Sequence, residues 1–107
     1  MAALSPQLRV AVARLAAPAS EQEAYLRNLG TAPSVDELAL EFSDALMVDK
    51  GSLEQAVRDI ALQLDDQLSA MSGPQYENLW TLAALQSRPE WVSIRELAAE
   101  ILRRDVR

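Results

Sequence analysis

Glycine and proline stand at separated points along the chain, and each marks a place where a helix must end or begin. The intervals between them hold no linker, repeat or low-complexity tract, so successive helices should follow one another closely. The breakers therefore predict six helices within a single domain over residues 1–107. The helix-breaking residues are Pro18, Gly30, Pro33, Gly51, Gly73, Pro74 and Pro89. The expected helices cover residues 5–17, 20–29, 34–48, 52–71, 75–87 and 89–105.

Serine residues mark the expected starts of several of these helices. In a capping box, a serine side chain accepts a free backbone N–H, and a Glu or Gln three residues later bonds back to the serine. For the first helix, Ser5 should be the cap and Pro6 the first helical residue, because proline lacks an N–H that would need a partner. Three pairs have capping-box spacing: Ser20 with Glu23, Ser34 with Glu37, and Ser52 with Gln55.

Apolar residues recur at helical spacing inside these segments. Half of the residues are hydrophobic but only 5% are aromatic, so Leu, Ala, Val and Ile must build most of the core. Ala and Leu favour helices. We therefore expect an all-α fold, a compact orthogonal or bundle-like array of about six short helices. The clearest apolar stripes are Val35, Leu38, Ala39, Phe42, Ala45 and Leu46; Leu53, Val57, Ile60, Leu64, Leu68 and Met71; and Trp91, Ile94, Leu97, Ala98, Ile101 and Leu102.

The last third of the chain contains both tryptophans and the tyrosine Tyr76. Within one helix over residues 75–87, Tyr76 and Trp80 would share a face. We expect them to pack against the core, while partial exposure would make them anchors for a partner instead.

The chain contains neither cysteine nor histidine. Their absence removes the thiolate nucleophile, the commonest general base near neutral pH and the commonest transition-metal ligand. Zinc sites, haem sites and the usual catalytic triads are thereby excluded, and any catalysis would need carboxylates with a hard cation such as Mg²⁺. We expect no catalytic residue, no cofactor and no metal site.

No stretch of the chain approaches about 18 uncharged apolar residues, so no membrane span is expected. Residues 1–20 carry Arg9 and Arg14 and end in a run of small residues, as a targeting segment does. However, Arg14 interrupts the apolar run, and Ser5-Pro6 fits an ordinary helix start. A cytoplasmic protein is expected.

Negative charge is concentrated in the middle of the chain. The net charge is −6 overall, yet in residues 36–66 nine acids stand against Lys50 and Arg58, which gives −7 for that segment alone. The late arginines are offset by nearby acids. Nucleic acid is not an expected partner, because its phosphates would be repelled by the acidic middle. The nine acids are Asp36, Glu37, Glu41, Asp44, Asp49, Glu54, Asp59, Asp65 and Asp66.

Three of these acids form one stripe on the helix expected at residues 34–48. Glu37, Glu41 and Asp44 stand at helical positions i, i+4 and i+7, where like charges repel and do not help the helix. The stripe is either a solvated face that keeps the protein soluble or a surface for a basic partner.

Three apolar residues lie outside the main stripes. Leu40 and Met47 are opposite the main apolar face of their helix, and Leu62 is turned away from the stripe of the next one. Either other helices contact these helices on two sides, or the residues form an exposed patch that binds a partner or a second copy in a homodimer.

Glu41 and Asp44 also have an acid-x-x-acid spacing. This pair resembles half of the motif of all-α nucleotide pyrophosphohydrolases, which hold Mg²⁺ against a phosphate with paired carboxylates. The second half is not evident, because Asp59 and the pair Asp65-Asp66 lack the matching spacing. A carboxylate-dependent, magnesium-binding nucleotide phosphohydrolase is therefore an alternative function.

The run from Tyr25 to Phe42, with the later segment from Glu77 to Thr81, resembles small acidic all-helical proteins of high-GC bacteria. Nine arginines to one lysine, and eighteen alanines, suit such a genome. The resemblance implies no activity. The charge pattern favours a small protein–protein interaction module, such as an inhibitor or immunity-type protein that masks a basic partner. A self-associating structural helical module is the remaining alternative.

Overall fold

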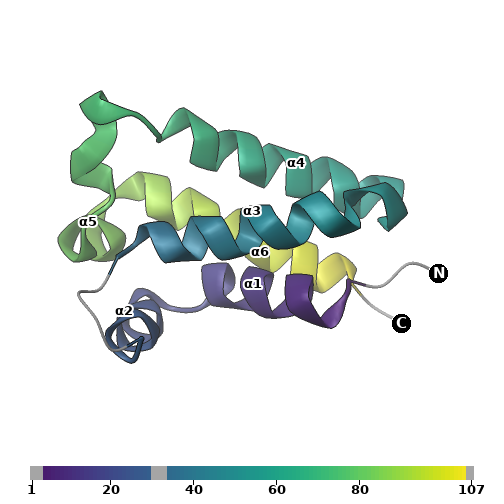
Figure 1. Cartoon of the computed structure of the whole chain (residues 1–107), viewed down its shortest axis with the longest axis horizontal. Coiled ribbons are helices and arrows are strands. Elements are labelled where there is room, and N and C mark those ends of the chain that lie inside the picture. The colour runs from purple at the N-terminus through teal and green to yellow at the C-terminus, as the bar shows by residue number, and fades with distance from the viewer. Residues whose placement is uncertain (1–3, 30–33, 106–107) are drawn as a thin grey trace.

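The computed structural model describes residues 4–29 and 34–105, and within these ranges every regular element is helical. Six α-helices and two short 3-10 helices are present, with no strand in this part of the chain (Figure 1). The prediction of an all-α fold is confirmed. The elements are α1 (Pro6–Ala16), α2 (Ala19–Arg27), α3 (Asp36–Asp49), η1 (Lys50–Ser52), α4 (Gln55–Ala70), η2 (Pro74–Leu79), α5 (Leu82–Ser87) and α6 (Pro89–Arg104).

The four longest helices run side by side as a bundle. α1, α3, α4 and α6 lie along the long axis, and the short helices α2 and α5 close one end (Figure 1). α6 packs most extensively, against α1 on one side and α4 on the other, while α3 covers α1 and meets α4. None of the described helices is long and apolar enough to cross a membrane.

The last helix, α6, is the centre of the core. Its residues at helical spacing, Trp91, Ile94, Ala98 and Ile101, are all completely buried. The only polar atom of the Trp91 ring, Nε1, is hydrogen-bonded, because it donates to the carbonyl oxygen of Leu79 at 2.7 Å. Burying a side chain of this size contributes roughly 1.5–3 kcal/mol, so the α6 stripe is a large part of what holds the bundle together.

The start of α1 is tied to the ends of two other helices. Ser5 caps α1 as predicted, its Oγ accepting the Leu8 N–H at 3.1 Å. The Ser5 N–H in turn donates to Asp49 at the end of α3, over 3.1 Å. Asp105, just after α6, accepts the Leu4 N–H at 3.1 Å and pairs with Arg9 at 2.7 Å. The two ends of the described chain therefore meet.

Gln22 on α2 is the single buried polar side chain among the described residues, only 1% exposed. Its Nε2 donates to the carbonyl oxygens of Arg14 and Leu15 at 2.9 and 3.0 Å, two acceptors in the last turn of α1. Its Oε1 accepts from Arg95 of α6 at 3.1 Å. Partial burial lowers the pKa of Arg95, and the amide oxygen compensates for some of the lost hydration.

The three predicted capping boxes are not where the helices begin. α2 starts at Ala19 because Pro18, already extended, serves as its cap. α3 starts at Asp36, and Ser34 accepts the Glu37 N–H through its backbone carbonyl at 3.1 Å. Ser52 lies in η1 and donates to the Asp49 carbonyl at 2.9 Å, so Glu54 becomes the cap of α4.

The single helix predicted over residues 75–87 is also wrong. The chain forms η2, breaks at Trp80 and Thr81, and then begins α5. Thr81 provides the break, because its Oγ1 caps α5 by accepting the Ala84 N–H at 3.0 Å. Tyr76 has a non-helical φ of −114°, so it does not share an α-helical face with Trp80.

Gln22 should be worth more to stability than any glutamine on the surface. We expect Gln22→Ala to lower the free energy of unfolding by about 2–3 kcal/mol, because the variant removes three hydrogen bonds and leaves Arg95 with the Leu85 carbonyl as its acceptor. Urea denaturation followed by circular dichroism measures this change. The matched control is Gln86→Ala, which removes an exposed amide that donates to Glu23 at 2.9 Å, and which should change stability by no more than about 0.5 kcal/mol. Equal losses in the two variants would contradict the role given to Gln22.

Candidate functional site

Leu40 and Met47 lie on the outer side of α3 and are exposed to 55% and 71% of their surface. The inner side of the same helix buries Leu38, Phe42, Ala45 and Leu46. No described helix covers the outer side, so the interpretation that α3 is contacted on two sides is wrong for these residues. The exposed-patch interpretation is the one that the burial of α3 favours.

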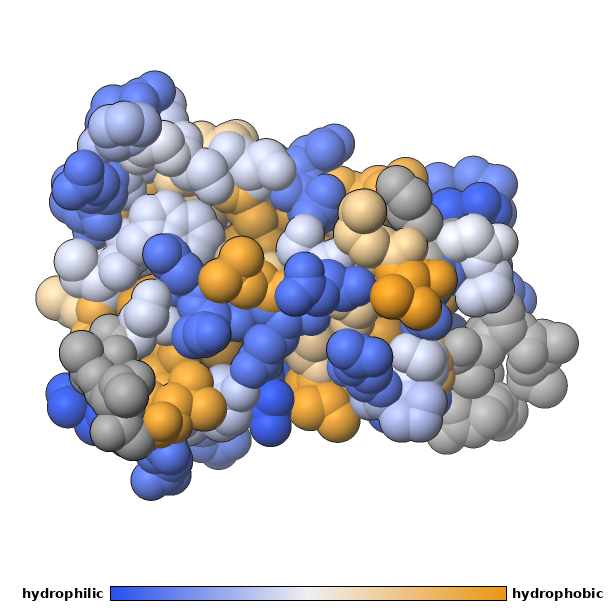
Figure 2. Space-filling model, viewed as in Figure 1, coloured by the Kyte–Doolittle hydropathy of each residue, from blue (hydrophilic) through white to orange (hydrophobic). Residues whose placement is uncertain are grey.

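α4 adds a third apolar side chain to the same side. Leu62, 38% exposed, borders a small hollow together with Met47 and Asp65, where α3 and α4 run next to each other. We name the α3–α4 face as the exposed apolar residues Leu40, Met47 and Leu62 together with the acids Asp36, Asp44 and Asp65 around them. Figure 2, which looks onto the side where α3 lies in front (Figure 1), shows hydrophobic patches separated by hydrophilic side chains.

Val48 was not singled out in the sequence, although it is 79% exposed. It follows Met47 and stands four residues after Asp44, on the solvent side of α3. Helical spacing could have identified it, because it lies outside the apolar stripe that includes Leu38 and Phe42. It extends the exposed apolar surface of α3 toward α1.

Most acids of residues 36–66 have no ion-pair partner among the described residues. Among the ion pairs of the described residues, only Glu41 comes from this segment, paired with Arg14. The other arginines in these pairs are bound to acids elsewhere, as in Arg27–Glu23 and Arg104–Glu100, both at 2.8 Å. Apart from Glu41, the acids of this segment are therefore not neutralised by ion pairs with the described residues.

The structure separates the three acids of the predicted stripe. Glu41 turns toward α1 and α2, where its carboxylate accepts from Arg14 at 3.1 Å and from the Tyr25 hydroxyl. Arg14 also lies over the Tyr25 ring, 3.9 Å from its centroid. Glu41 therefore joins three helices and is not a free surface charge.

Glu37 and Asp44 differ from Glu41 and from each other. One carboxylate oxygen of Glu37 is inaccessible to solvent and has no hydrogen-bond partner among the described residues. Asp44 is exposed. Of the three predicted acids, Asp44 is thus the one placed most directly for a partner.

The acid-x-x-acid pair does border a common hollow. Glu41 and Asp44 line a cavity of about 470 Å³ between α1 and α3, but Arg14 lines it too and pairs with Glu41. Within residues 4–29 and 34–105, no three His, Cys, Asp or Glu side chains are placed to hold one metal ion. No observation in this part of the chain favours the phosphohydrolase.

Tyr25 is the titratable member of the Arg14–Tyr25–Glu41 contact. Burial raises the pKa of Tyr25, the hydrogen bond to Glu41 and the charge of that carboxylate raise it further, and Arg14 opposes them. The protonated hydroxyl is the form that can donate to Glu41. The contact therefore stabilises the fold fully below the ordinary tyrosine pKa of 10.0 and is lost as pH rises through the higher folded-state value.

We expect Tyr25→Phe to lower the free energy of unfolding by about 1 kcal/mol at pH 7, the usual value of one hydrogen bond. Denaturation of both proteins across the alkaline range should show the difference shrinking above pH 10. The matched control is Tyr76→Phe, which removes an exposed tyrosine and should leave stability nearly unchanged. A Tyr25→Phe loss that persists undiminished at high pH would contradict the role of the hydroxyl.

No protein family model matches the chain, and neither a curated protein nor a solved structure does so. The resemblance to helical proteins of high-GC bacteria stays a prediction. The function of the chain is therefore inferred from its own surface.

Proposed function

We propose that the chain is a small acidic interaction module whose α3–α4 face binds a basic protein, as an inhibitor or immunity-type protein would. The observation that carries the proposal is the exposure of Leu40 and Met47 among acids that no arginine of the described fold neutralises. Apolar side chains at the centre of a patch with charges at its rim have the layout of a protein interface.

The two kinds of residue would contribute differently to binding. Burying Leu40, Met47 and Leu62 removes apolar surface from water, which is worth up to roughly 1.5–3 kcal/mol for each side chain that is fully covered. These contacts act mainly on the dissociation rate. The acids Asp36, Asp44 and Asp65 would attract a basic partner and speed its association, an effect that salt weakens.

Self-association is the second candidate, because Met47 and Leu62 border the same hollow. A twofold dimer through the α3–α4 face would place the same patch of each copy against the other. The acids of the two copies would then meet like charges, which costs binding energy. The charge pattern therefore supports a basic partner over a second copy, and sedimentation at high concentration separates the two.

A photoreactive amino acid at position 47 should capture the partner from a lysate of the native host. The same amino acid at Ser93, exposed on α6, is the control and should capture it much less. We expect the captured protein to be basic and to be absent at high salt. Capture of the same proteins from both positions, or of a second copy of the chain alone, would contradict the proposal.

Binding of that purified partner can then be measured by calorimetry. We expect the double variant Leu40→Ala, Met47→Ala to weaken binding at least about tenfold, since it removes apolar contact area. Val92→Ala changes an apolar residue of α6 that is 45% exposed and should leave affinity unchanged. Asp44→Asn should slow association and reduce its salt dependence. An unchanged affinity in the double variant would rule out the α3–α4 face as the binding surface.

A further inference from the structure

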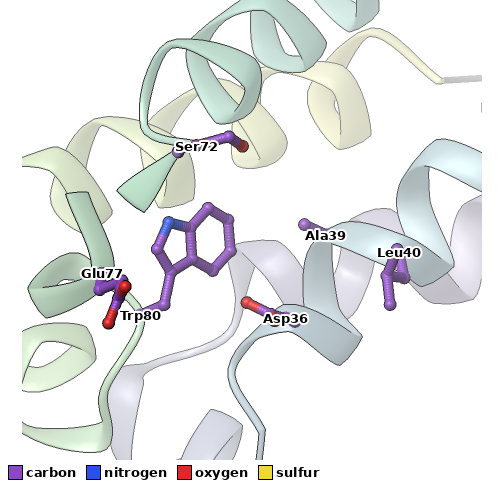
Figure 3. A pocket seen from close by; sticks show the side chains of 7 residues that line it. Asp36, Ala39, Leu40, Ser72, Glu77 and Trp80 are labelled. Carbon is purple, nitrogen blue, oxygen red and sulfur yellow. The ribbon is translucent and has the colours of Figure 1, made fainter. Parts of the chain in front are cut away.

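One end of the α3–α4 face opens into a pocket. This hollow of about 490 Å³ lies where the start of α3 faces the turn between α4 and η2. Its lining includes Asp36, Ala39 and Leu40 from α3, Ser72 after α4, and Glu77 and Trp80 from η2 and its end (Figure 3). Because Asp36 and Leu40 also belong to the α3–α4 face, a partner bound on that face could reach into the pocket.

The Trp80 ring is the fixed wall of this pocket. Its Nε1 donates to the Met71 carbonyl at 2.7 Å. It also meets the buried Trp91 ring nearly at right angles, with the two centroids 5.3 Å apart. The indole N–H is therefore already used, and what the ring can offer a ligand is its π face.

Two carboxylates flank that ring. In Figure 3 the indole lies between the side chains of Glu77 and Asp36. Both residues are exposed, and neither takes part in an ion pair among the described residues. None of the described residues that line the pocket is basic. It therefore attracts a cation and repels a phosphate or a carboxylate.

We propose that this pocket binds an arginine side chain of the basic partner, an inference that rests on the proposed function of the α3–α4 face. A guanidinium is flat and weakly hydrated, so it stacks on an indole face while its edge donates to carboxylates. Ala39 and Leu40 supply apolar surface for the methylene groups of the same side chain. A lysine ammonium would gain the charge attraction but not the stacking.

The pocket can be tested without the partner. The probe is a capped pentapeptide with one arginine between glycines, titrated into the full chain while the two indole N–H signals are followed by NMR. The chain has only two tryptophans, and Trp91 is fully buried, so Trp80 reports on the pocket. We expect a saturable shift of the Trp80 signal. The same peptide with neutral citrulline, or with lysine, should bind at least about tenfold more weakly.

Charge variants separate the pocket from general attraction. Asp36→Asn with Glu77→Gln should weaken binding of the arginine peptide at least about tenfold. The matched control is Asp59→Asn with Asp66→Asn, which removes the same charge from exposed positions of α4 outside the pocket lining and should have little effect. Trp80→Leu should abolish binding. If that variant does not fold because it loses buried contacts, the variants at the exposed residues Asp36 and Glu77 still test the pocket.

The outcomes distinguish this proposal from the proposed function. Equal weakening by both pairs of charge variants, equal binding of the lysine peptide, or no shift of the Trp80 signal would overturn the arginine pocket. The basic partner captured through position 47 would be untouched by those results. Conversely, a specific shift with arginine together with an unchanged partner affinity in Met47→Ala, Leu62→Ala, two residues outside the pocket lining, would support the pocket and overturn the rest of the α3–α4 face as an interface.

Discussion

Burial of the last helix of the chain is the constraint on which the rest of the fold depends. α6 supplies four fully buried residues, Trp91 among them, and it packs against α1, α4 and α5. α1 and α4 come earlier in the sequence, so the core cannot close until the C-terminal part of the chain is in place. The polar ties follow the same pattern, since Arg95 of α6 binds Gln22 and Asp105 binds the start of α1. These bonds join segments that are far apart in sequence, and they fix α6 in one register.

The position of α6 decides which surfaces are left over. The apolar stripe of α4 packs against α6, and that of α3 packs against α1 and the core. Both helices therefore have an outer side that no other described helix covers. Exposed Leu and Met residues would normally promote aggregation. The acids around them oppose contact between identical copies and favour contact with a basic surface. In the proposed function, one charge pattern would both keep copies apart and select a partner.

Some features with local causes could be predicted from the sequence, although the three capping boxes, which are equally local, were wrong. Features with distant causes could not be predicted. The cap at Ser5 depends on neighbours within three residues, and the stripe of α6 depends only on helical spacing, so both were predicted correctly. Glu41 could not be assigned, because its partners Arg14 and Tyr25 are 27 and 16 residues away and only the packing of three helices brings them together. For the same reason, the sequence could not show whether Glu41 lies in a surface stripe or in a contact between helices. Helical spacing placed Met47 outside the apolar stripe of α3, but whether another helix covers it depended on how the bundle packs, which no local pattern shows.

The helix predicted over residues 75–87 is interrupted at the place where the pocket forms, and the interruption also positions the pocket wall. A continuous α-helix would have satisfied its own backbone groups and set Tyr76 beside Trp80 on one face. Instead, the chain enters η2 after Gly73, whose φ of +116° is one that L side chains rarely adopt, and Thr81 then ends η2 by capping the separate helix α5. Trp80 can then reach back to the Met71 carbonyl and stand against Trp91. The interruption of the helix places a fixed aromatic wall on the same pocket as Asp36 (Figure 3), and departures from local preference are expected at functional or strained sites.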